Sequence, residues 1–207
     1  AIESSNSFPH SSGIASSASG MSALALGIMS IEKSGNPSMS EAYFLNKASF
    51  LARLGSGSAA RSIQGPVVSW GVSDVIEGSS DLYGTPLSSA LHPVFQDYQD
   101  TILLIDKGQK KVSSTLGHNL MKNHPYAATR FEQARTKVKL LKLILASGDL
   151  DAFVSLVESE ALTLHALMMA SEPYFILMHP NTLQVINKVC AYRKETQSAL
   201  CFTLDAG

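Results

Sequence analysis

The chain has 207 residues, 45% of them hydrophobic and 16% charged, which is enough to bury the core of one large domain or two small ones and excludes a disordered chain. Sixteen basic and 17 acidic residues leave a net charge of −1, so no basic field exists to hold nucleic acid. Apolar stretches are short and interrupted, and we expect no membrane partner. The opening residues carry no signal-peptide pattern, and two cysteines, Cys190 and Cys201, suit buried positions in a reducing compartment; we expect a cytoplasmic protein.

The first half of the chain predicts two helices. A Ser/Gly-rich turn over residues 5–20 precedes apolar residues at helical spacing from 21 to 29. The second helix is expected to begin near Ser38 or Ser40, as a capping residue, and to end at Gly55. A strand containing Val67, Val68 and Trp70 follows, and residues 77–98 are expected to be irregular and to contain a domain boundary.

The second half predicts a strand at 101–106, helices at about 125–147, 149–170 and 180–195, and a strand at 199–204. Gly148 separates the first two helices, and Asp149 is the expected cap of the second. Irregular mixing of strands and helices predicts an α+β fold with domains at 1–98 and 99–207. Apolar helix positions are expected in the core, some of them at a dimer face: Leu140, Leu143, Leu156, Leu162, Leu167 and Met168.

Two segments of small residues are candidate anion sites. Residues 9–20 precede a helix, so free backbone N–H groups and the helix dipole can meet a phosphate, with Ser16 or Ser17 offering a hydroxyl to phosphate or Mg²⁺. A tight turn before a core helix is an equally good interpretation. In residues 53–62, Arg61 follows Ser58 by about one helical turn, which predicts a carboxylate or phosphate pocket. A helix end with an exposed arginine is the alternative.

Two further segments are weaker signals. Residues 110–118 contain Lys110, Lys111, Ser113, Ser114 and Thr115, and a solvated basic turn is their simplest interpretation. Asp205 follows an apolar segment, where a carboxylate acts as a general base or, more often, forms a turn. The six histidines show no metal-ligand spacing.

Taken in order, the four segments resemble the mevalonate diphosphate decarboxylase family of the GHMP kinase superfamily. Residues 6–20 match its phosphate loop, 55–65 its G-S-G-S-A-x-R-S-x-x-G motif, 112–117 its V-S-S-T-x-G turn and 202–207 its F-T-x-D-A-G motif. Family sequences begin ahead of the phosphate loop and continue past D-A-G, so we expect an incomplete sheet and an incomplete active site in this polypeptide.

The resemblance implies a fold and a reaction. The expected fold is GHMP kinase-like, with an incomplete N-terminal ribosomal-protein-S5-like part and a C-terminal ferredoxin-like α/β sandwich. The implied reaction uses ATP and Mg²⁺ to phosphorylate the 3-hydroxyl of mevalonate 5-diphosphate and then to release phosphate and CO₂, giving isopentenyl diphosphate. The family is commonly homodimeric. Alternatives are a related mevalonate or mevalonate-phosphate 3-kinase, a phosphomevalonate decarboxylase, or a non-catalytic fragment of the same fold.

The resemblance also implies residue roles. ATP phosphates would bind at Gly13, Ile14, Ala15, Ser16, Ser17, Ala18, Ser19 and Gly20, with Ser17 nearest Mg²⁺. The substrate would bind at Ser56, Gly57, Ser58, Ala59, Ala60 and Arg61, with Ser114 and Thr115 at its diphosphate. Asp205, by the 3-hydroxyl, and Arg61, on the carboxylate, would be the catalytic residues.

Overall fold

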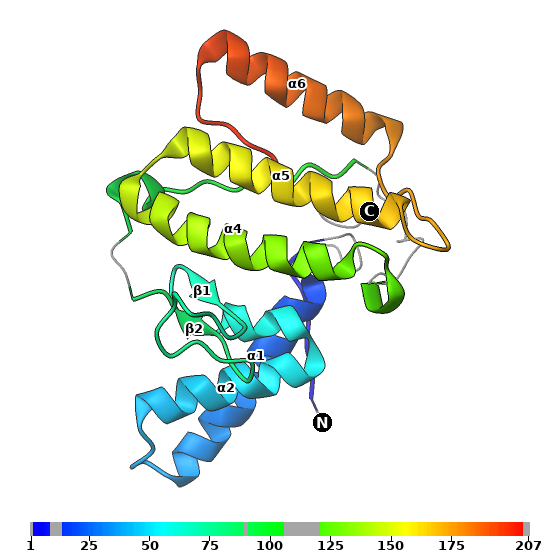
Figure 1. Cartoon of the computed structure of the whole chain (residues 1–207). Helices are drawn as coiled ribbons and strands as arrows, with labels where there is room; N and C mark the ends of the chain where they lie inside the picture. Colours follow the sequence, from blue (N-terminus) through cyan, green and yellow to red (C-terminus); the bar gives the residue numbers. More distant parts are fainter. Residues whose placement is uncertain (1, 9–13, 89–90, 106–120, 205–207) are drawn as a thin grey trace. The chain divides into compact units, whose positions relative to one another are not determined.

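The computed structural model of the chain describes residues 2–8, 14–88, 91–105 and 121–204 (Figure 1). The chain divides into two compact units, one of Ala1–Ser11 with Ala15–Ser89 and one of Ser12–Ile14 with Ala90–Gly207. The predicted domain limits, 1–98 and 99–207, stay a prediction. Each unit is described below by itself.

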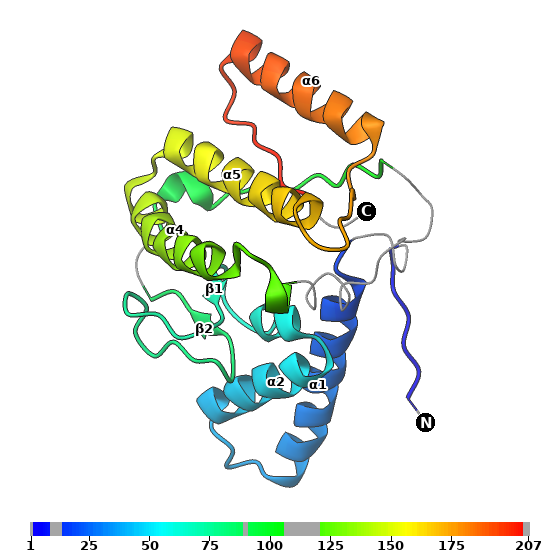
Figure 2. The ribbon, with the colours of Figure 1, turned by 45° about the vertical axis from the view of Figure 1, so that its right-hand side comes forward.

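The first unit begins with two helices that lie side by side, α1 (Ser16–Gly35) and α2 (Glu41–Gly55) (Figure 2). The predicted cap is confirmed, because the Tyr43 N–H donates to Ser40 Oγ over 3.2 Å. The predicted end at Gly55 is confirmed as well. The start of α1 differs from the expectation, because residues 16–20 are already helical. Serine and alanine are well tolerated in the first turn of a helix. Gly20 faces open space, so its missing side chain leaves no packing gap.

Small side chains hold this unit together. Ala18, Ala25, Ala52 and Ala59 form one buried cluster, which joins α1, α2 and the short 3₁₀ helix η1 (Gly57–Ser62). At Gly55, a Cβ atom would lie 2.2 Å from the sulfur of Met21, so the end of α2 is in close contact with α1. A second cluster, at the far ends of the two helices, contains the larger side chains Met29, Met39, Phe44 and Ala48. Alanine and glycine thus bring the backbone of η1 against the first turn of α1.

A two-stranded antiparallel ladder completes the unit. Strand β1 (Val68–Ser69) pairs with β2 (Thr85–Pro86), with Val68 opposite Pro86 and Ser69 opposite Thr85. The predicted strand near 67–70 is confirmed in a shorter form. The prediction that all of 77–98 is irregular is wrong at β2, because its pairing depends on a distant strand rather than on local sequence.

The second unit contains η2 (Pro93–Phe95), η3 (Met121–Asn123) and three long helices, α4 (Ala127–Ser147), α5 (Leu150–Met169) and α6 (Pro180–Thr196). All three predicted helices are confirmed. Gly148 ends α4 with φ 79°, a backbone conformation that glycine adopts without strain. Asp149 caps α5 as predicted, because its carboxylate accepts a 2.9 Å hydrogen bond from the Ala152 N–H.

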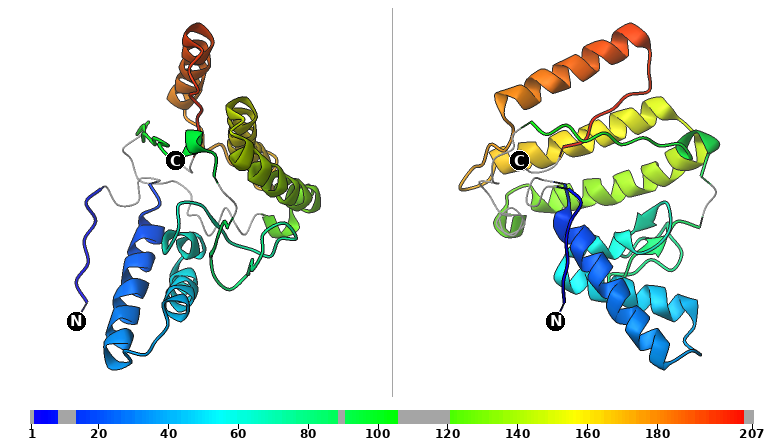
Figure 3. Two further views of the ribbon diagram at one scale, coloured as in Figure 1. Left: turned by 90° about the vertical axis from the view of Figure 1, so that its left-hand side faces the viewer. Right: turned by 180° about the vertical axis from the view of Figure 1, so that it is seen from behind.

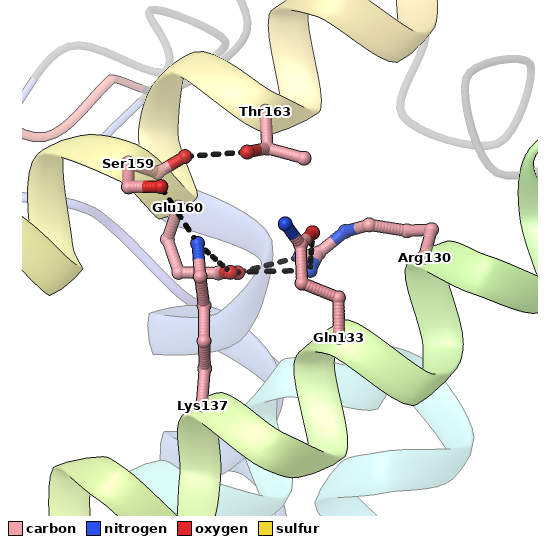
Figure 4. Close-up of polar contacts among 6 residues, drawn as sticks. All are labelled: Arg130, Gln133, Lys137, Ser159, Glu160 and Thr163. Atoms are coloured by element: carbon pink, nitrogen blue, oxygen red, sulfur yellow. Dashed lines mark hydrogen bonds and ion pairs between the residues drawn. The ribbon is translucent and has the colours of Figure 1, made fainter.

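Ion pairs join α4 to α5 (Figure 4). The guanidinium of Arg130 donates to both carboxylate oxygens of Glu160, at 3.1 and 2.5 Å. Lys137 binds the same carboxylate at 2.8 Å and the Ser159 hydroxyl at 2.9 Å. Burial raises the pKa of Glu160, but the hydrogen bonds from the two cations outweigh burial and hold that pKa below its ordinary value.

Two predicted strands are absent from the described residues. Residues 101–105 and 199–204 are irregular segments, and the second lies beside α5, where the Phe202 N–H reaches Glu158 (Figure 3). A strand exists only where a second strand accepts its ladder hydrogen bonds, and the described residues offer none to these segments. The exposed fractions of Ile102 and Leu103, 56% and 58%, show that this apolar sequence is uncovered here.

The helices of this unit leave several apolar side chains exposed. Leu167 is buried as predicted, whereas Leu140, Leu143 and Leu162 are exposed. The spacing of apolar residues therefore did not identify which face of each helix is buried. Both cysteines are half-buried and free rather than buried. By length and composition alone α5 could also cross a membrane, a criterion that a core helix of a soluble protein meets as well. The expectation of no membrane partner stays a prediction.

Candidate functional site

The first candidate element is the N-terminus of α1. The helix begins after Ala15, whose φ of 55° is a left-handed conformation that costs an alanine about 1 kcal/mol. Ala15 supplies no capping side chain, and the first turn contains no acidic residue. The N–H groups of Ser16, Ser17 and Ala18 therefore face outward without helical acceptors, at the positive end of the helix dipole. This arrangement can bind a phosphate.

The second candidate element is η1. Ala59 and Ala60 are fully buried, so their side chains anchor η1 instead of facing a ligand. Ser58 is half-buried and Arg61, in the last turn, is exposed. Among the described residues, none forms a hydrogen bond or an ion pair with the Arg61 guanidinium, which leaves its five donors available for an anion. Gly57 packs on Trp70, because a Cβ there would lie 2.9 Å from the indole ring.

The two elements meet at their hydroxyl groups. Ser17 lies on the first turn of α1, and Ser56 is the residue that precedes η1. Their Oγ atoms are 3.3 Å apart. Thirty-nine residues separate the two serines in sequence. Behind them, Ala18 and Ala59 share the buried alanine cluster. The structure therefore brings the first turn of α1, which is part of the predicted phosphate-binding segment, together with the predicted substrate-binding segment at a polar, partly exposed place within one compact unit.

Sequence reasoning missed Ser49, a fully buried residue of α2. Its hydroxyl donates to the Ala60 carbonyl oxygen and accepts from the Gly84 N–H, both over 2.7 Å. One side chain thus fixes η1, one residue before Arg61, and also the chain that leads into β2. The available signal was a serine on the apolar face of α2, next to Ala48 and Ala52, where a polar group needs buried partners.

The other predicted site residues lie outside the described residues. These are Gly13, Lys110, Lys111, Ser114, Thr115 and Asp205. Ile14 is described and half-buried, Ser19 is exposed and Gly20 lies within the first turns of α1. The roles of all these residues stay predictions.

Magnesium fits the described site only as an ion held mainly by phosphate. The described part of the chain contains no group of three His, Cys, Asp or Glu side chains that could hold a metal. Ser17, with an exposed hydroxyl at the helix N-terminus, is the available protein oxygen. Mg²⁺ commonly binds one or two protein oxygens, substrate phosphates and waters, so such a donor set is compatible with it.

Protein-family comparison assigns both parts of the chain. Residues 1–81 match the "Diphosphomevalonate decarboxylase-like N-terminal domain", and residues 101–207 match the "Mevalonate 5-diphosphate decarboxylase C-terminal domain". The solved structures that the chain resembles have the GHMP kinase-type fold. The chain belongs to the mevalonate diphosphate decarboxylase family.

Individual relatives agree with this assignment. A diphosphomevalonate decarboxylase of Gibberella zeae is 30% identical over the whole chain, and a phosphomevalonate decarboxylase of Haloferax volcanii is 28% identical over the whole chain. The chain covers 52% of the first protein and 59% of the second. It thus spans a little over half the length of these curated relatives.

Two solved structures are similar along nearly the whole chain. A mevalonate diphosphate decarboxylase from Legionella pneumophila is 29% identical with a TM-score of 0.78, and the match covers 98% of this chain and 59% of that one. A structure described as "MDDEF in complex with MVAPP, AMPPCP and Magnesium" is 25% identical with a TM-score of 0.68, covering 97% and 57% of the two chains.

Proposed function

We propose that this chain is part of an enzyme that converts mevalonate 5-diphosphate and Mg-ATP to isopentenyl diphosphate, ADP, phosphate and CO₂. The observation that carries the proposal is the contact of Ser17 with Ser56, where the two motif segments meet. Family membership supports it, as does the similarity to a structure that contains MVAPP, AMPPCP and magnesium.

The phosphates of ATP bind at the N-terminus of α1 in this proposal. The free N–H groups of the first turn and the hydroxyls of Ser16, Ser17 and Ser19 donate to phosphate oxygens. When bound, Mg²⁺ offsets the charge that collects on the transferred group. Gly13, Ile14, Ala15, Ala18 and Gly20 have no polar side-chain atoms, so they contribute backbone groups.

The substrate binds beside this place, on η1. Ser56 and Ser58 donate hydroxyl hydrogen bonds, Gly57 contributes backbone, and the guanidinium of Arg61 binds the carboxylate in bidentate geometry. Ala59 and Ala60 are fully buried and hold η1 in place. Ser114 and Thr115 bind the 5-diphosphate. Arg61 keeps the carboxylate ionised and oriented until the C–C bond breaks.

The reaction then proceeds in two steps. Asp205 orients the 3-hydroxyl and accepts its proton as the oxygen takes the γ-phosphoryl group of ATP, which leaves ADP. In the second step the C–O bond to phosphate breaks, the carboxylate leaves as CO₂, and the electron pair of the broken C–C bond forms the alkene. Phosphorylation has converted a poor leaving group into a good one.

The sub-fold of each part, the cellular location, the oligomeric state and the partners belong to the same proposal. We assign the chain a ribosomal-protein-S5-like part followed by a ferredoxin-like part, and expect a cytoplasmic homodimer without nucleic acid or membrane partners. Two free cysteines support the reducing compartment, and a net charge of −1 supports the absence of a nucleic acid partner. Exposed leucines on α4 support a further protein contact.

A product assay on three substrates tests the proposed reaction. The intact protein is incubated with Mg-ATP and mevalonate, its 5-phosphate or its 5-diphosphate, and ADP, phosphate and CO₂ are measured. We expect equal amounts of all three products, and only from the diphosphate. CO₂ from the monophosphate would favour the second candidate, which the Haloferax relative supports. ADP without CO₂ would indicate a 3-kinase, and no turnover a non-catalytic member.

Substitutions then test the two predicted catalytic residues. Asp205→Asn is expected to lower kcat by several orders of magnitude with little change in KM, because positioning of the 3-hydroxyl is lost. Arg61→Gln is expected to lower the rate of decarboxylation more than the affinity for ATP. A near-normal kcat of the first variant, or selective loss of ATP binding in the second, would contradict these roles.

A further inference from the structure

An ion pair on the side of α5 remote from α4 has no part in the mechanism above. Glu158 of α5 and Arg193 of α6 form a bidentate pair, with Nη1–Oε1 at 2.5 Å and Nη2–Oε2 at 3.1 Å. The exposed side-chain fractions are 15% for Glu158 and 26% for Arg193. The hydrogen bond to Glu158 raises the pKa of Arg193.

The same two side chains also hold the backbone that precedes the F-T-x-D-A-G motif. Arg193 Nη1 donates to the Leu200 carbonyl oxygen over 2.8 Å, and the Phe202 N–H donates to Glu158 Oε1 over 3.4 Å. Burial raises the pKa of the Cys201 thiol, which lies between these two residues. The backbone at Leu200 and Phe202 is therefore held by one side chain from α6 and one from α5.

This arrangement replaces the ladder that the sequence predicted for residues 199–204. Those residues have no strand partner among the described ones, so side chains supply a donor and an acceptor at alternate positions, as a neighbouring strand would. Asp205 follows Phe202 by three residues, which span at most about 10 Å of chain. Glu158 and Arg193 thus hold the backbone three and five residues ahead of Asp205 in the sequence.

We infer that Glu158 and Arg193 are positioning residues for the reaction, which hold the backbone ahead of Asp205 so that its carboxylate reaches the substrate. The inference rests on the proposed function, in which Asp205 is the catalytic carboxylate. Neither residue needs to touch the substrate. A displacement of about 1 Å at a reacting group is enough to lower a rate by about 100-fold.

The Arg130–Glu160 pair provides a matched control (Figure 4). It also uses a glutamate of α5, bidentate geometry and partly buried side chains, 16% and 30% exposed. The contacts found for it run to α4 and do not include residues 199–204. Removing either glutamate costs an ion pair, but only Glu158 contacts the backbone ahead of Asp205.

The experiment compares Glu158→Gln and Arg193→Lys with Glu160→Gln in the intact protein, measuring kcat, both KM values and thermal unfolding. We expect kcat to fall 10- to 100-fold in the first two variants with KM changes below threefold, and to stay within twofold in the control. Arg193→Lys keeps the charge and provides the measurement if Glu158→Gln does not fold. In an Asp205→Asn background, Glu158→Gln should lower the residual kcat by less than twofold.

Two results would overturn the inference. If the unsubstituted protein releases CO₂ and Asp205→Asn is inactive, but Glu158→Gln and Arg193→Lys retain kcat as the control does, the pair is only structural and the proposed function stands. If the unsubstituted protein releases no CO₂ from any of the three substrates, the proposed function and this inference both fail.

Discussion

Ser49→Ala is the substitution that most directly tests how the site is held. The Ser49 hydroxyl is completely buried and joins the Ala60 carbonyl oxygen to the Gly84 N–H through two 2.7 Å hydrogen bonds. Removing one oxygen atom leaves both backbone groups without this partner. A Cβ on Gly84 would lie only 2.4 Å from the Ala60 oxygen, so the two backbone segments are in close contact here.

The magnitude follows from these two groups. A buried donor or acceptor left unsatisfied costs about 1 to 3 kcal/mol, and alanine fills nearly the same volume as serine, so the loss of packing is small. We expect Ser49→Ala to lower the free energy of unfolding by about 2 to 4 kcal/mol. Because Ala60 directly precedes Arg61, we also expect a lower kcat/KM in the variant that remains folded.

Denaturant unfolding of the intact protein, followed by circular dichroism, measures this loss. Ser30→Ala is the matched control, because Ser30 lies on an exposed face of α1 and its hydroxyl donates only to the Leu26 carbonyl oxygen of its own helix. We expect the control to change stability by less than about 0.5 kcal/mol. An equally small change for Ser49→Ala would refute the argument that Ser49 joins η1 to the chain before β2.

Two further predictions concern the second unit. Hydrogen bonds from Arg130 and Lys137 outweigh burial and hold the pKa of Glu160 in the folded protein below the ordinary 4.5. Ionised Glu160 therefore stabilises the folded protein fully above pH 4.5, and this contribution is lost as the pH falls through the lower pKa of the folded state. Glu160→Gln should therefore cost about 1 kcal/mol at pH 7 and flatten the acid limb of a stability–pH curve; an unchanged limb would contradict the lowered pKa. Asp149→Ala removes the cap on the Ala152 N–H and should cost about 1 kcal/mol in denaturant unfolding, with Asp149→Ser restoring most of it; equal losses in both variants would exclude capping.

Local signals in the sequence were sufficient to predict where most of the helices begin and end. Ser40 and Asp149 are capping residues and Gly148 is a terminating residue, and each acts within four residues of its own position. The sequence therefore predicted α2, α4 and α5 closely. The start of α1 was placed late because serine and glycine are typical of both turns and first turns of helices.

Strands and buried polar groups could not be predicted in this way. A strand at 101–106 or 199–204 depends on a partner elsewhere, and β2 exists only because β1 lies opposite it. Ser49, Glu158 and Arg193 act through backbone groups that lie 7 to 44 residues away in sequence, which periodicity does not reveal. Motif resemblance, by contrast, identified both segments that the structure joins at Ser17 and Ser56.

The most direct test of the central claim is a crystal structure of the intact protein with Mg²⁺, a non-hydrolysable ATP analogue and mevalonate 5-diphosphate. The account predicts that the β- and γ-phosphates lie on the N–H groups of the first turn of α1, with Ser17 at the γ-phosphate, and that the Arg61 guanidinium binds the substrate carboxylate. Nucleotide phosphates bound away from α1, or a carboxylate held by a residue other than Arg61, would contradict it.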